Sequence, residues 1–234
     1  MRRSRLFNPW LAGVTIVAGL AAGCSDPTDR LLLSRTGSGG HVPPPEIDLP
    51  APQNGEFQVA YFAGGCFWSV EAMFERLDGV QEAVSGFSGG SAETAIYNLV
   101  VGGGTEHTET VRVTYDPSRI TYGQLLQIFF TAIHDPTQVD RQGPDVGRQY
   151  RSEIFYTSEA QKNVVQSYIQ QLNASGVIQG TIATKLTPFK AFYPAEEEHQ
   201  DFVAKNWTHH YVVTFTWPKL DKLRQAYPEF YREL

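Results

Sequence analysis

Cys66 stands at a junction in the chain where a cysteine can act as a nucleophile. It directly follows Gly64-Gly65. Residues 57–63 are rich in aromatic and β-branched types, which is typical of a strand, whereas apolar side chains recur at helical spacing over 67–77. The two glycines therefore turn a strand into a helix, and the thiol lies in the first helical turn. Unpaired backbone N–H groups and the helix dipole stabilise a thiolate there, so we expect the pKa of Cys66 to be lowered. A lone cysteine is more often a small buried hydrophobe, but the glycine turn and the helix start favour the nucleophile.

Phe67 and Trp68 are placed to form an apolar wall beside that thiol. Aromatic rings at a helix start more often belong to the core, yet a ring left partly exposed there would bind a small apolar group of a substrate. Both interpretations remain open at this point.

Glu109 is placed where a carboxyl group can stay neutral. It follows the glycine run 102–104 and comes one residue before the alternating pattern of 110–115. If the side chain points inward at the strand end, loss of water raises its pKa and lets the protonated acid donate a proton. A solvated glutamate is the commoner alternative.

Three further clusters combine polar, charged and aromatic residues. They are His134-Asp135-Pro136, the loop 142–152 with its spaced glycines, and the segment 192–200 with three consecutive glutamates. Long polar loops beside a rigid sheet are often functional, whereas a run of acids also suits the exposed N-terminus of a helix. Nothing resembles HExxH or paired CxxC spacing, so we expect no metal site.

The elements that must position these residues alternate between strands and helices. Strands are predicted at 57–63, 110–115, 152–156 and 181–186, helices from the capping boxes Thr121-x-x-Gln124 and Ser158-x-x-Gln161, a short polar helix at 196–205 and a peripheral helix or coil at 218–234. Neither glycine-rich nucleotide-binding motif is present. We predict an α/β fold, a two-layer sandwich with a mixed β-sheet and a ferredoxin-like core.

Length and composition indicate one domain with an N-terminal extension. The chain has 234 residues, of which 41% are hydrophobic, enough for a single core. A basic start, a short apolar run and Gly23-Cys24 predict a signal peptide over 1–23 of the bacterial lipoprotein type, with Cys24 lipidated. The proline- and glycine-rich segment 24–55 is expected to be a disordered tether and 56–234 the catalytic domain. The mature protein is then expected to be exported and lipid-anchored to a bacterial membrane, with the outer membrane facing the periplasm favoured.

The charge and the cysteines restrict the partners. The formal net charge is −6, and loss of three arginines with residues 1–23 makes it −9. Nucleic acid is therefore not expected as a partner. With Cys24 tied to lipid, Cys66 has no partner cysteine within the chain, although an oxidising compartment favours paired cysteines.

Several of these motifs together resemble the peptide methionine sulfoxide reductases of the A type. The resemblance runs collinearly from about residue 57 to 205 and rests on several segments: Gly65-Cys66-Phe67-Trp68, His107-Thr108-Glu109, His134-Asp135-Pro136, Asp145-x-Gly147-x-Gln149-Tyr150-Arg151-Ser152 and Phe192-Tyr193-Pro194-Ala195-Glu196-Glu197-Glu198-His199-Gln200. It implies thiol-dependent reduction of the S epimer of methionine sulfoxide, peptide-bound or free, in the repair of oxidised proteins.

The resemblance also implies a role for each matched residue. Cys66 would attack the sulfoxide sulfur and become a sulfenic acid, and Glu109 would protonate the oxygen. Tyr97 and Tyr150 would hydrogen-bond that oxygen, with Asp145 as the supporting acid. The methyl group would lie against Phe67 and Trp68.

The chain departs from the family pattern at three places. Glu106 stands where a glycine is usual, Thr94-Ala95-Ile96 lacks a proline common before the first tyrosine, and 206–234 contains no resolving cysteine. We therefore expect a one-cysteine form, monomeric and without a bound cofactor, whose sulfenic acid is reduced by an external thiol such as a thioredoxin-like protein or a small dithiol. Cys24 is an alternative resolver if it escapes lipidation, because a flexible linker of about 40 residues is long enough to reach.

Two other classes of function stay open from the residues alone. One is a thiol peroxidase or a Cys–His hydrolase that pairs Cys66 with His107, His134 or His199, for which ester or amide cleavage would be diagnostic. The other is a surface lipoprotein that binds methionine-containing peptides without turnover.

Overall fold

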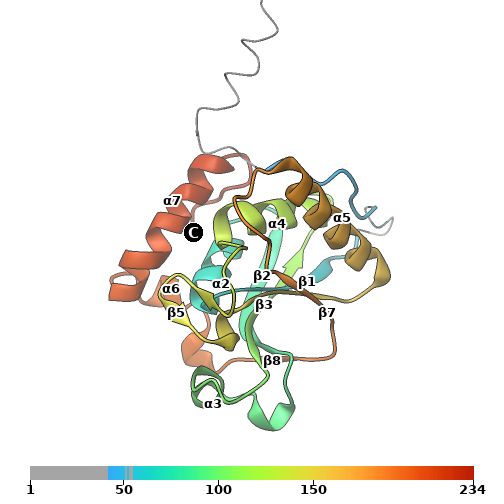
Figure 1. The fold of residues 1–234 in the computed structure, drawn as a ribbon. Coiled ribbons are helices and arrows are strands. Elements are labelled where there is room, and N and C mark those ends of the chain that lie inside the picture. The colour runs from blue at the N-terminus through green and yellow to red at the C-terminus, as the bar shows by residue number, and fades with distance from the viewer. Residues whose placement is uncertain (1–41, 51, 53–54) are drawn as a thin grey trace, which may run out of the picture. The chain divides into compact units, whose positions relative to one another are not determined.

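The centre of the fold is a mixed sheet of six strands (Figure 1). The computed structural model describes residues 42–50, 52 and 55–234. The sheet order is β7-β6-β1-β3-β2-β8, and the strands span Gln58–Gly64 (β1), Val80–Ser88 (β2), Thr108–Tyr115 (β3), Ser152–Tyr156 (β6), Lys185–Pro188 (β7) and Phe192–Pro194 (β8). A separate two-stranded hairpin pairs β4 (Arg141–Gln142) with β5 (Asp145–Val146).

The strand pairing confirms the predicted fold class. Strand β1 lies between β3 and β6 and is antiparallel to both, whereas β6 and β7 are parallel. The four neighbouring strands β6-β1-β3-β2, with α2 after β1 and α4 after β3, have the order of a ferredoxin-like core. The fold is therefore α/β with a mixed sheet.

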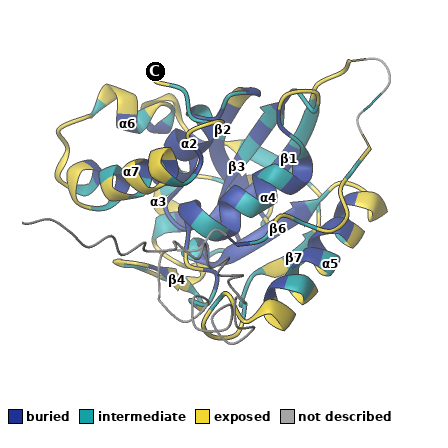
Figure 2. Cartoon of the chain, turned by 90° about the horizontal axis from the view of Figure 1, so that it is seen from above, coloured by how far each residue is buried: buried dark blue, intermediate teal, exposed yellow. Residues whose placement is uncertain are grey.

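Helices cover the sheet and pack beside one another (Figures 1 and 2). The α-helices are α2 (Phe67–Glu75), α3 (Tyr97–Val101), α4 (Tyr122–Ile128), α5 (Glu159–Ser175), α6 (Phe202–Lys205) and α7 (Trp217–Ala226). Three 3-10 turns, η1 (Ala92–Thr94), η3 (Arg148–Tyr150) and η4 (Glu197–His199), and two π-helical segments, η2 (Phe129–Ile133) and η5 (Val212–Thr216), complete the helical structure. Of the two predicted capping boxes, the one at Thr121 is formed, with the side chains of Thr121 and Gln124 each accepting from the other's backbone N–H. At Ser158 only half of the box is present, because the side chain of Gln161 accepts from the N–H of Thr157 instead.

The core lies between the sheet and these helices. Phe62 of β1 is fully buried, and its ring stands 5.0 Å from Phe74 of α2 and 5.1 Å from Phe129. The alternation of β1 directs every second side chain toward this layer. Truncating a buried phenylalanine of this kind costs about 3–5 kcal/mol, so the core holds the β1–α2 connection rigidly.

Three predicted elements differ from the structure. The strand expected at 181–186 begins only at Lys185. The helix expected at 196–205 is interrupted at Asp201, which has a φ of +52°. This left-handed residue separates the 3-10 turn η4 from helix α6. The segment 218–234 is not peripheral, because α7 buries Leu220 and Leu223 in the main core.

The chain is fixed to the fold earlier than residue 56. We call residues 42–50 the N-terminal strap. Val42 is buried, the Tyr168 hydroxyl donates to the carbonyl of Pro43 at 2.7 Å, and the N–H of Gly123 donates to Asp48 at 2.8 Å. The strap thus lies against α4 and α5, although this stretch was expected to belong to the tether. The predicted signal peptide, Cys24 and the rest of the tether up to residue 41 lie outside the described residues.

None of the helices within 42–50 and 55–234 is both long and apolar enough to cross a membrane.

Candidate active site

The thiol of Cys66 lies at the turn between β1 and α2. Strand β1 ends at Gly64 and Cys66 is the N-cap of α2, as the sequence predicted. Gly65 between them has φ +98°, and a Cβ there would stand 2.6 Å from the side chain of Gln142. Only glycine fits this turn without strain. Cys66 is 9% exposed and is a free cysteine.

Glu109 lies beside the nucleophile, on β3. Its carboxyl oxygen Oε2 accepts a hydrogen bond of 2.9 Å from the backbone N–H of Phe67, and its side chain is buried. Burial raises the pKa of Glu109 to about 8, more than the hydrogen bond from Phe67 lowers it. The prediction of a neutral, inward-pointing acid is confirmed, so at neutral pH Glu109 holds a proton that it can donate.

Aromatic rings form one wall of the site. Phe67 is fully buried, whereas Trp68 is partly exposed and stacks on Phe202 with ring centroids 3.7 Å apart. Tyr97, the first residue of α3, stacks on His199 at 3.9 Å and stands 6.2 Å from the Phe67 ring. The rings leave the partly exposed Trp68 as an apolar surface near the thiol.

Asp145, Tyr150 and Tyr211 approach Cys66 from three other segments. The Tyr211 hydroxyl donates to Asp145 Oδ2 at 2.7 Å and is near enough to the Cys66 side chain that its interaction with the sulfur acts to lower the pKa of the thiol. The pKa of Tyr97 is raised to about 12 and that of Tyr150 is raised further, chiefly by burial and then by Glu109 and Cys66. Both phenols therefore stay protonated and can donate hydrogen bonds.

The expected lowering of the Cys66 pKa is wrong. Burial, and then the carboxyl groups of Glu109 and Asp145, raise the pKa of the thiol well above its usual value. The backbone N–H of Trp68 and the Tyr211 hydroxyl act in the opposite direction but are outweighed. The helix start does supply the predicted N–H donor, but the desolvation of a buried thiolate costs more. Cys66 therefore rests as a thiol and must be ionised during reaction.

The three histidines considered for a Cys–His pair are engaged elsewhere. His107 Nε2 contacts the carbonyl of Ser91 at 2.9 Å. His134 Nε2 contacts the Ser152 hydroxyl at 2.7 Å, and burial lowers its pKa to about 3. His199 Nδ1 accepts from Trp68 Nε1 at 3.3 Å. In the described structure no hydrogen bond joins Cys66 to a histidine, so the hydrolase alternative has no base.

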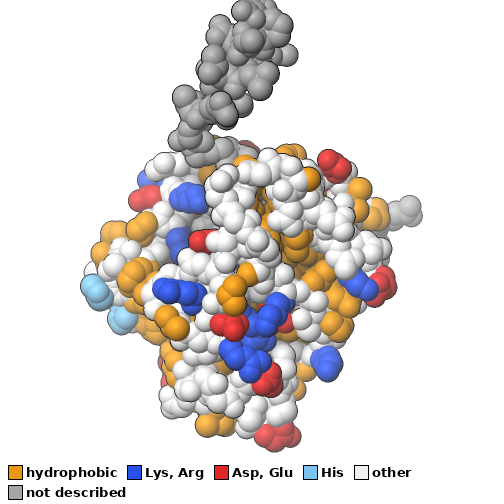
Figure 3. Space-filling model, in the orientation of Figure 1, with side chains coloured by type: hydrophobic (Ala, Val, Ile, Leu, Met, Phe, Trp, Pro, Cys, Tyr) orange, Lys and Arg blue, Asp and Glu red, His pale blue; other side chains and the backbone are white. Residues whose placement is uncertain are grey.

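The unusual Glu106 is paired. Its carboxylate is bound by both terminal nitrogens of Arg148, at 2.7 and 3.1 Å. Arg148 begins the 3-10 turn that carries Tyr150. Glu106 thus connects the glycine-rich loop to the Tyr150 segment, at an exposed position where solvent screens the pair and it contributes little to stability. On the molecular face drawn in Figure 3, acidic and basic side chains are intermixed in the same way.

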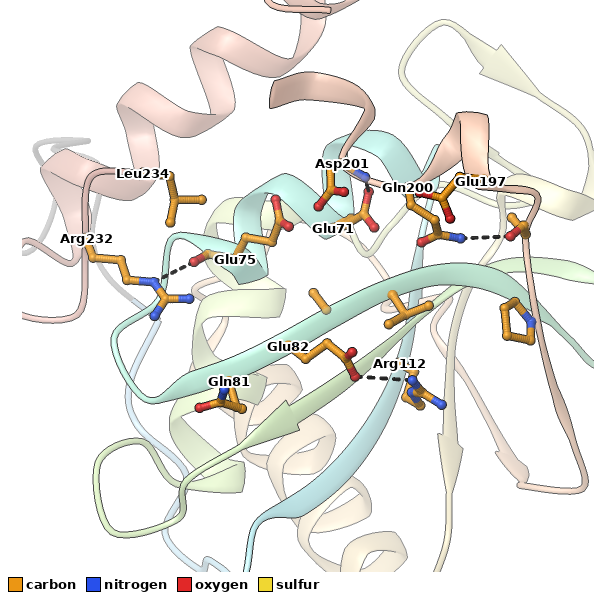
Figure 4. A pocket seen from close by; sticks show the side chains of 14 residues that line it. Glu71, Glu75, Gln81, Glu82, Arg112, Glu197, Gln200, Asp201, Arg232 and Leu234 are labelled. Atoms are coloured by element: carbon orange, nitrogen blue, oxygen red, sulfur yellow. Dashed lines mark hydrogen bonds and ion pairs between the residues drawn. The ribbon is translucent and has the colours of Figure 1, made fainter. Parts of the chain in front are cut away.

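A hollow of about 600 Å³ lies elsewhere along α2 and does not include Cys66 (Figure 4). Its lining includes Glu71, Glu75 and Asp201 together with Arg112 and Arg232. The buried Glu71 accepts from the N–H of Asp201 at 3.1 Å, and burial raises its pKa to about 8. This carboxyl joins α2 to the C-terminal part of the chain. Among the residues that the structure describes, no group of histidines, cysteines and acids is arranged to hold a metal ion.

Sequence reasoning missed the contribution of the C-terminal residues. Tyr211 and Lys219 of α7 interact with the charged groups around Cys66. His199, which was considered only as a possible base, accepts a hydrogen bond from Trp68. No periodicity marks these residues. The only sequence signal is the unusual share of aromatic residues in 192–217.

A buried thiol beside a buried neutral carboxylic acid defines the site as that of a thiol-based oxidoreductase rather than a hydrolase. The model of the family "Peptide methionine sulfoxide reductase" matches residues 58–230. The chain belongs to this family, as the motifs indicated.

The chain aligns with its relatives over most of their length. The chain is 51% identical over 190 residues to peptide methionine sulfoxide reductase MsrA 2 of Synechocystis, covering 80% of this chain and 89% of the relative. It is 46% identical over 175 residues to peptide methionine sulfoxide reductase MsrA of Thermus thermophilus, covering 75% and 98%. The protein is therefore an oxidoreductase that reduces methionine sulfoxide.

Solved structures share the fold. Methionine sulfoxide reductase A of Corynebacterium diphtheriae matches with TM-score 0.57 and 33% identity, over 72% of this chain and 88% of that one. The reduced form of Mxr1 from Saccharomyces cerevisiae matches with TM-score 0.60 and 34% identity, over 68% of this chain and 90% of that one.

Proposed function

We propose that this enzyme reduces the S epimer of methionine sulfoxide, peptide-bound and free, through a sulfenic acid on Cys66. The observation that carries the proposal is the placement of Glu109, a buried acid held by the N–H of the residue next to the nucleophile. The Cys66 thiolate attacks the sulfoxide sulfur while Glu109 gives its proton to the oxygen. Oxygen then passes to Cys66, the methionine thioether leaves, and the cysteine is left as Cys–SOH.

The surrounding side chains fix the substrate. Tyr97 and Tyr150 donate hydrogen bonds to the sulfoxide oxygen, and Asp145 supports the site from the hairpin. Charge-assisted hydrogen bonds contribute roughly 1.5–3 kcal/mol each. The methyl group packs on Phe67 and Trp68. Because methyl and oxygen are bound by different walls, only one arrangement about the sulfur fits, which selects one epimer.

An external thiol completes the cycle. Cys66 is the one cysteine between residues 42 and 234. A thiolate of a thioredoxin-like protein or small dithiol attacks the sulfenic sulfur, water leaves, and the second thiol of the reductant releases Cys66. The enzyme acts as a monomer without a bound cofactor, and the products are methionine, water and the oxidised dithiol.

The test is single-turnover reduction of the two separated epimers of a methionine sulfoxide peptide by the full chain with excess dithiol. We expect loss of the S epimer only, abolished by Cys66→Ser and retained by Cys24→Ser. Consumption of the R epimer instead, or undiminished turnover by Cys66→Ser, would refute the proposal. If Cys24→Ser keeps the first turnover but loses the later ones under steady-state conditions, Cys24 is the resolving thiol.

We also propose that residues 1–23 direct export and that Cys24 carries lipid, which would hold the enzyme on a bacterial membrane, the outer one facing the periplasm being favoured. The sequence around Gly23-Cys24 supports this. Radiolabelled palmitate should enter the wild type but not Cys24→Ala, and membrane fractionation should release that variant. Equal labelling of both would contradict lipidation at Cys24.

A further inference from the structure

The C-terminal segment reaches the reacting sulfur through Tyr211. This residue precedes the π-helical segment η5, which continues into α7. Its ring meets Trp68 edge-on at 5.9 Å, and its hydroxyl bonds Asp145 of the hairpin at 2.7 Å. The segment contains no cysteine, so its presence in the site calls for another chemical role.

The Tyr211 hydroxyl has one hydrogen and two acceptors. It donates to Asp145 Oδ2 at 2.7 Å, and the neighbouring Cys66 side chain is the second group within its reach, since interaction between the two acts to lower the pKa of the thiol. A hydroxyl can donate one hydrogen bond and accept others. While Cys66 is a thiol, its S–H can donate to the tyrosine oxygen and the tyrosine can donate to the carboxylate. A thiolate, by contrast, needs the hydroxyl hydrogen for itself.

We propose that Tyr211 couples the ionisation of Cys66 to the protonation of Asp145. The proton of Sγ passes to the tyrosine oxygen as the tyrosine hydrogen passes to Oδ2, and the new O–H then points at the sulfur. No proton is lost to solvent, and one negative charge moves from the carboxylate to the thiolate. The proposal rests on the proposed role of Cys66 as the nucleophile and gives that buried thiol a route to its reactive form.

The other charged groups around the pair are compatible with this transfer. They are Glu109 on β3, Tyr97 on α3, Tyr150 on η3 and Lys219 on α7. Glu109 and the two phenols are neutral at pH 7. The ammonium of Lys219 is near enough to lower the pKa of Asp145, while burial raises it. Burial lowers the pKa of Lys219, whereas Cys66 and Asp145 act to raise it. In its protonated form Lys219 favours one negative charge in the site, on either the carboxylate or the thiolate.

The test is the alkylation of Cys66 by iodoacetamide as a function of pH, followed by mass in the full chain with Cys24→Ser in every background. Tyr211→Phe keeps the ring on Trp68 and removes the hydroxyl. We expect alkylation at pH 7 to fall about tenfold, since the thiolate loses a charge-assisted donor. Asp145→Asn imitates the protonated acid and frees the tyrosine hydrogen for sulfur, so alkylation should rise about tenfold. Tyr231→Phe, which removes a hydroxyl in the same C-terminal segment outside the site, should change nothing.

The double variant separates coupling from simple charge repulsion. If Tyr211 transmits the effect, Asp145→Asn should raise alkylation less than about threefold in the Tyr211→Phe background. A full tenfold gain there, or a Tyr211→Phe pH profile equal to wild type, would overturn the proposal. Should Tyr211→Phe unfold, 3-fluorotyrosine at position 211, a stronger donor, should speed alkylation, and an unchanged rate would count against the coupling. Alkylation needs no sulfoxide, so failure of this proposal is distinguishable from failure of the proposed reduction.

Discussion

The two sides of the active site are built by different means. On the sheet side, Cys66 and Glu109 are fixed by backbone: the β1–α2 turn, strand β3 and the hydrogen bond from the N–H of Phe67. On the C-terminal side, which we call the cover (residues 199–219), His199 and Tyr211 are held by ring contacts and side-chain hydrogen bonds. Backbone fixes the reacting atoms, whereas side chains adjust the charge and shape around them. The sheet side should therefore carry the larger catalytic effects.

The largest effect is expected from Glu109→Gln. Glutamine can still accept the N–H of Phe67 but has no acidic proton, so the rate of sulfoxide reduction should fall about 10²–10³-fold. In the wild type the rate should decline above pH 8, as the acid with pKa about 8 loses its proton. Steady-state rates from pH 6 to 9.5 check both points. Persistence of that alkaline decline in the variant would assign it to another group.

Glu71→Gln tests the connection between the two sides. The pKa of Glu71 is raised to about 8 in the folded protein, against about 4.3 in an unfolded chain. The folded state thus holds this proton more tightly, and the stabilisation is complete below pH 4 and lost as pH rises through 8.

Unfolding in urea at pH 5, 6.5 and 8 measures this effect. The free energy of unfolding should fall with rising pH in both proteins, but less steeply in the variant. The two slopes should differ by about 1 kcal/mol per pH unit. Glu75, whose pKa is raised to about 7, contributes to the remaining slope. Parallel pH dependences in the two proteins would show that Glu71 is charged in both states.

On the cover, His199→Phe should have a smaller effect. It keeps a ring against Tyr97 but removes the acceptor for Trp68 Nε1. One hydrogen bond contributes about 0.5–1.5 kcal/mol, so we expect KM for a sulfoxide peptide to rise about threefold with kcat little changed. The exposed His210→Phe is the matched control. A kcat loss as large as that of Glu109→Gln would remove the distinction between the two sides.

The smallest effect on activity is expected far from both sides, in the N-terminal strap. Asp48→Ala removes the acceptor for the N–H of Gly123 at the start of α4. It should lower the free energy of unfolding by about 1 kcal/mol and leave turnover unchanged. Thermal melting and turnover of the same samples provide the check, and altered turnover would connect the strap to the site.

The same contrast explains what the sequence could predict. The β1–α2 turn and β3 follow from local patterns of glycine and alternation, and the structure confirms them. For Glu109 the pattern left a buried and a solvated side chain open, and the structure shows the buried one. The expected thiol pKa was wrong because it depends first on burial of Cys66 and then on Glu109 and Asp145, which come from distant segments of the chain. Tyr211 carries no local signal, since its role arises only from the meeting of η5 with the hairpin β4–β5. The strap was missed because prolines suggested a tether, whereas their carbonyls accept hydrogen bonds from α5.

The strap also determines the length of chain that would connect the folded domain to the membrane. With lipid on Cys24 as proposed, 18 residue steps lead to Val42, whereas 32 would lead to Glu56. At about 3.5 Å per residue, full extension reaches about 60 Å instead of about 110 Å. The enzyme would then stay within a thin layer over the membrane and repair proteins that come near that surface. Its greatest distance from the membrane would depend on the hydrogen bonds that hold the strap on α4 and α5, and not on the number of residues before the first strand.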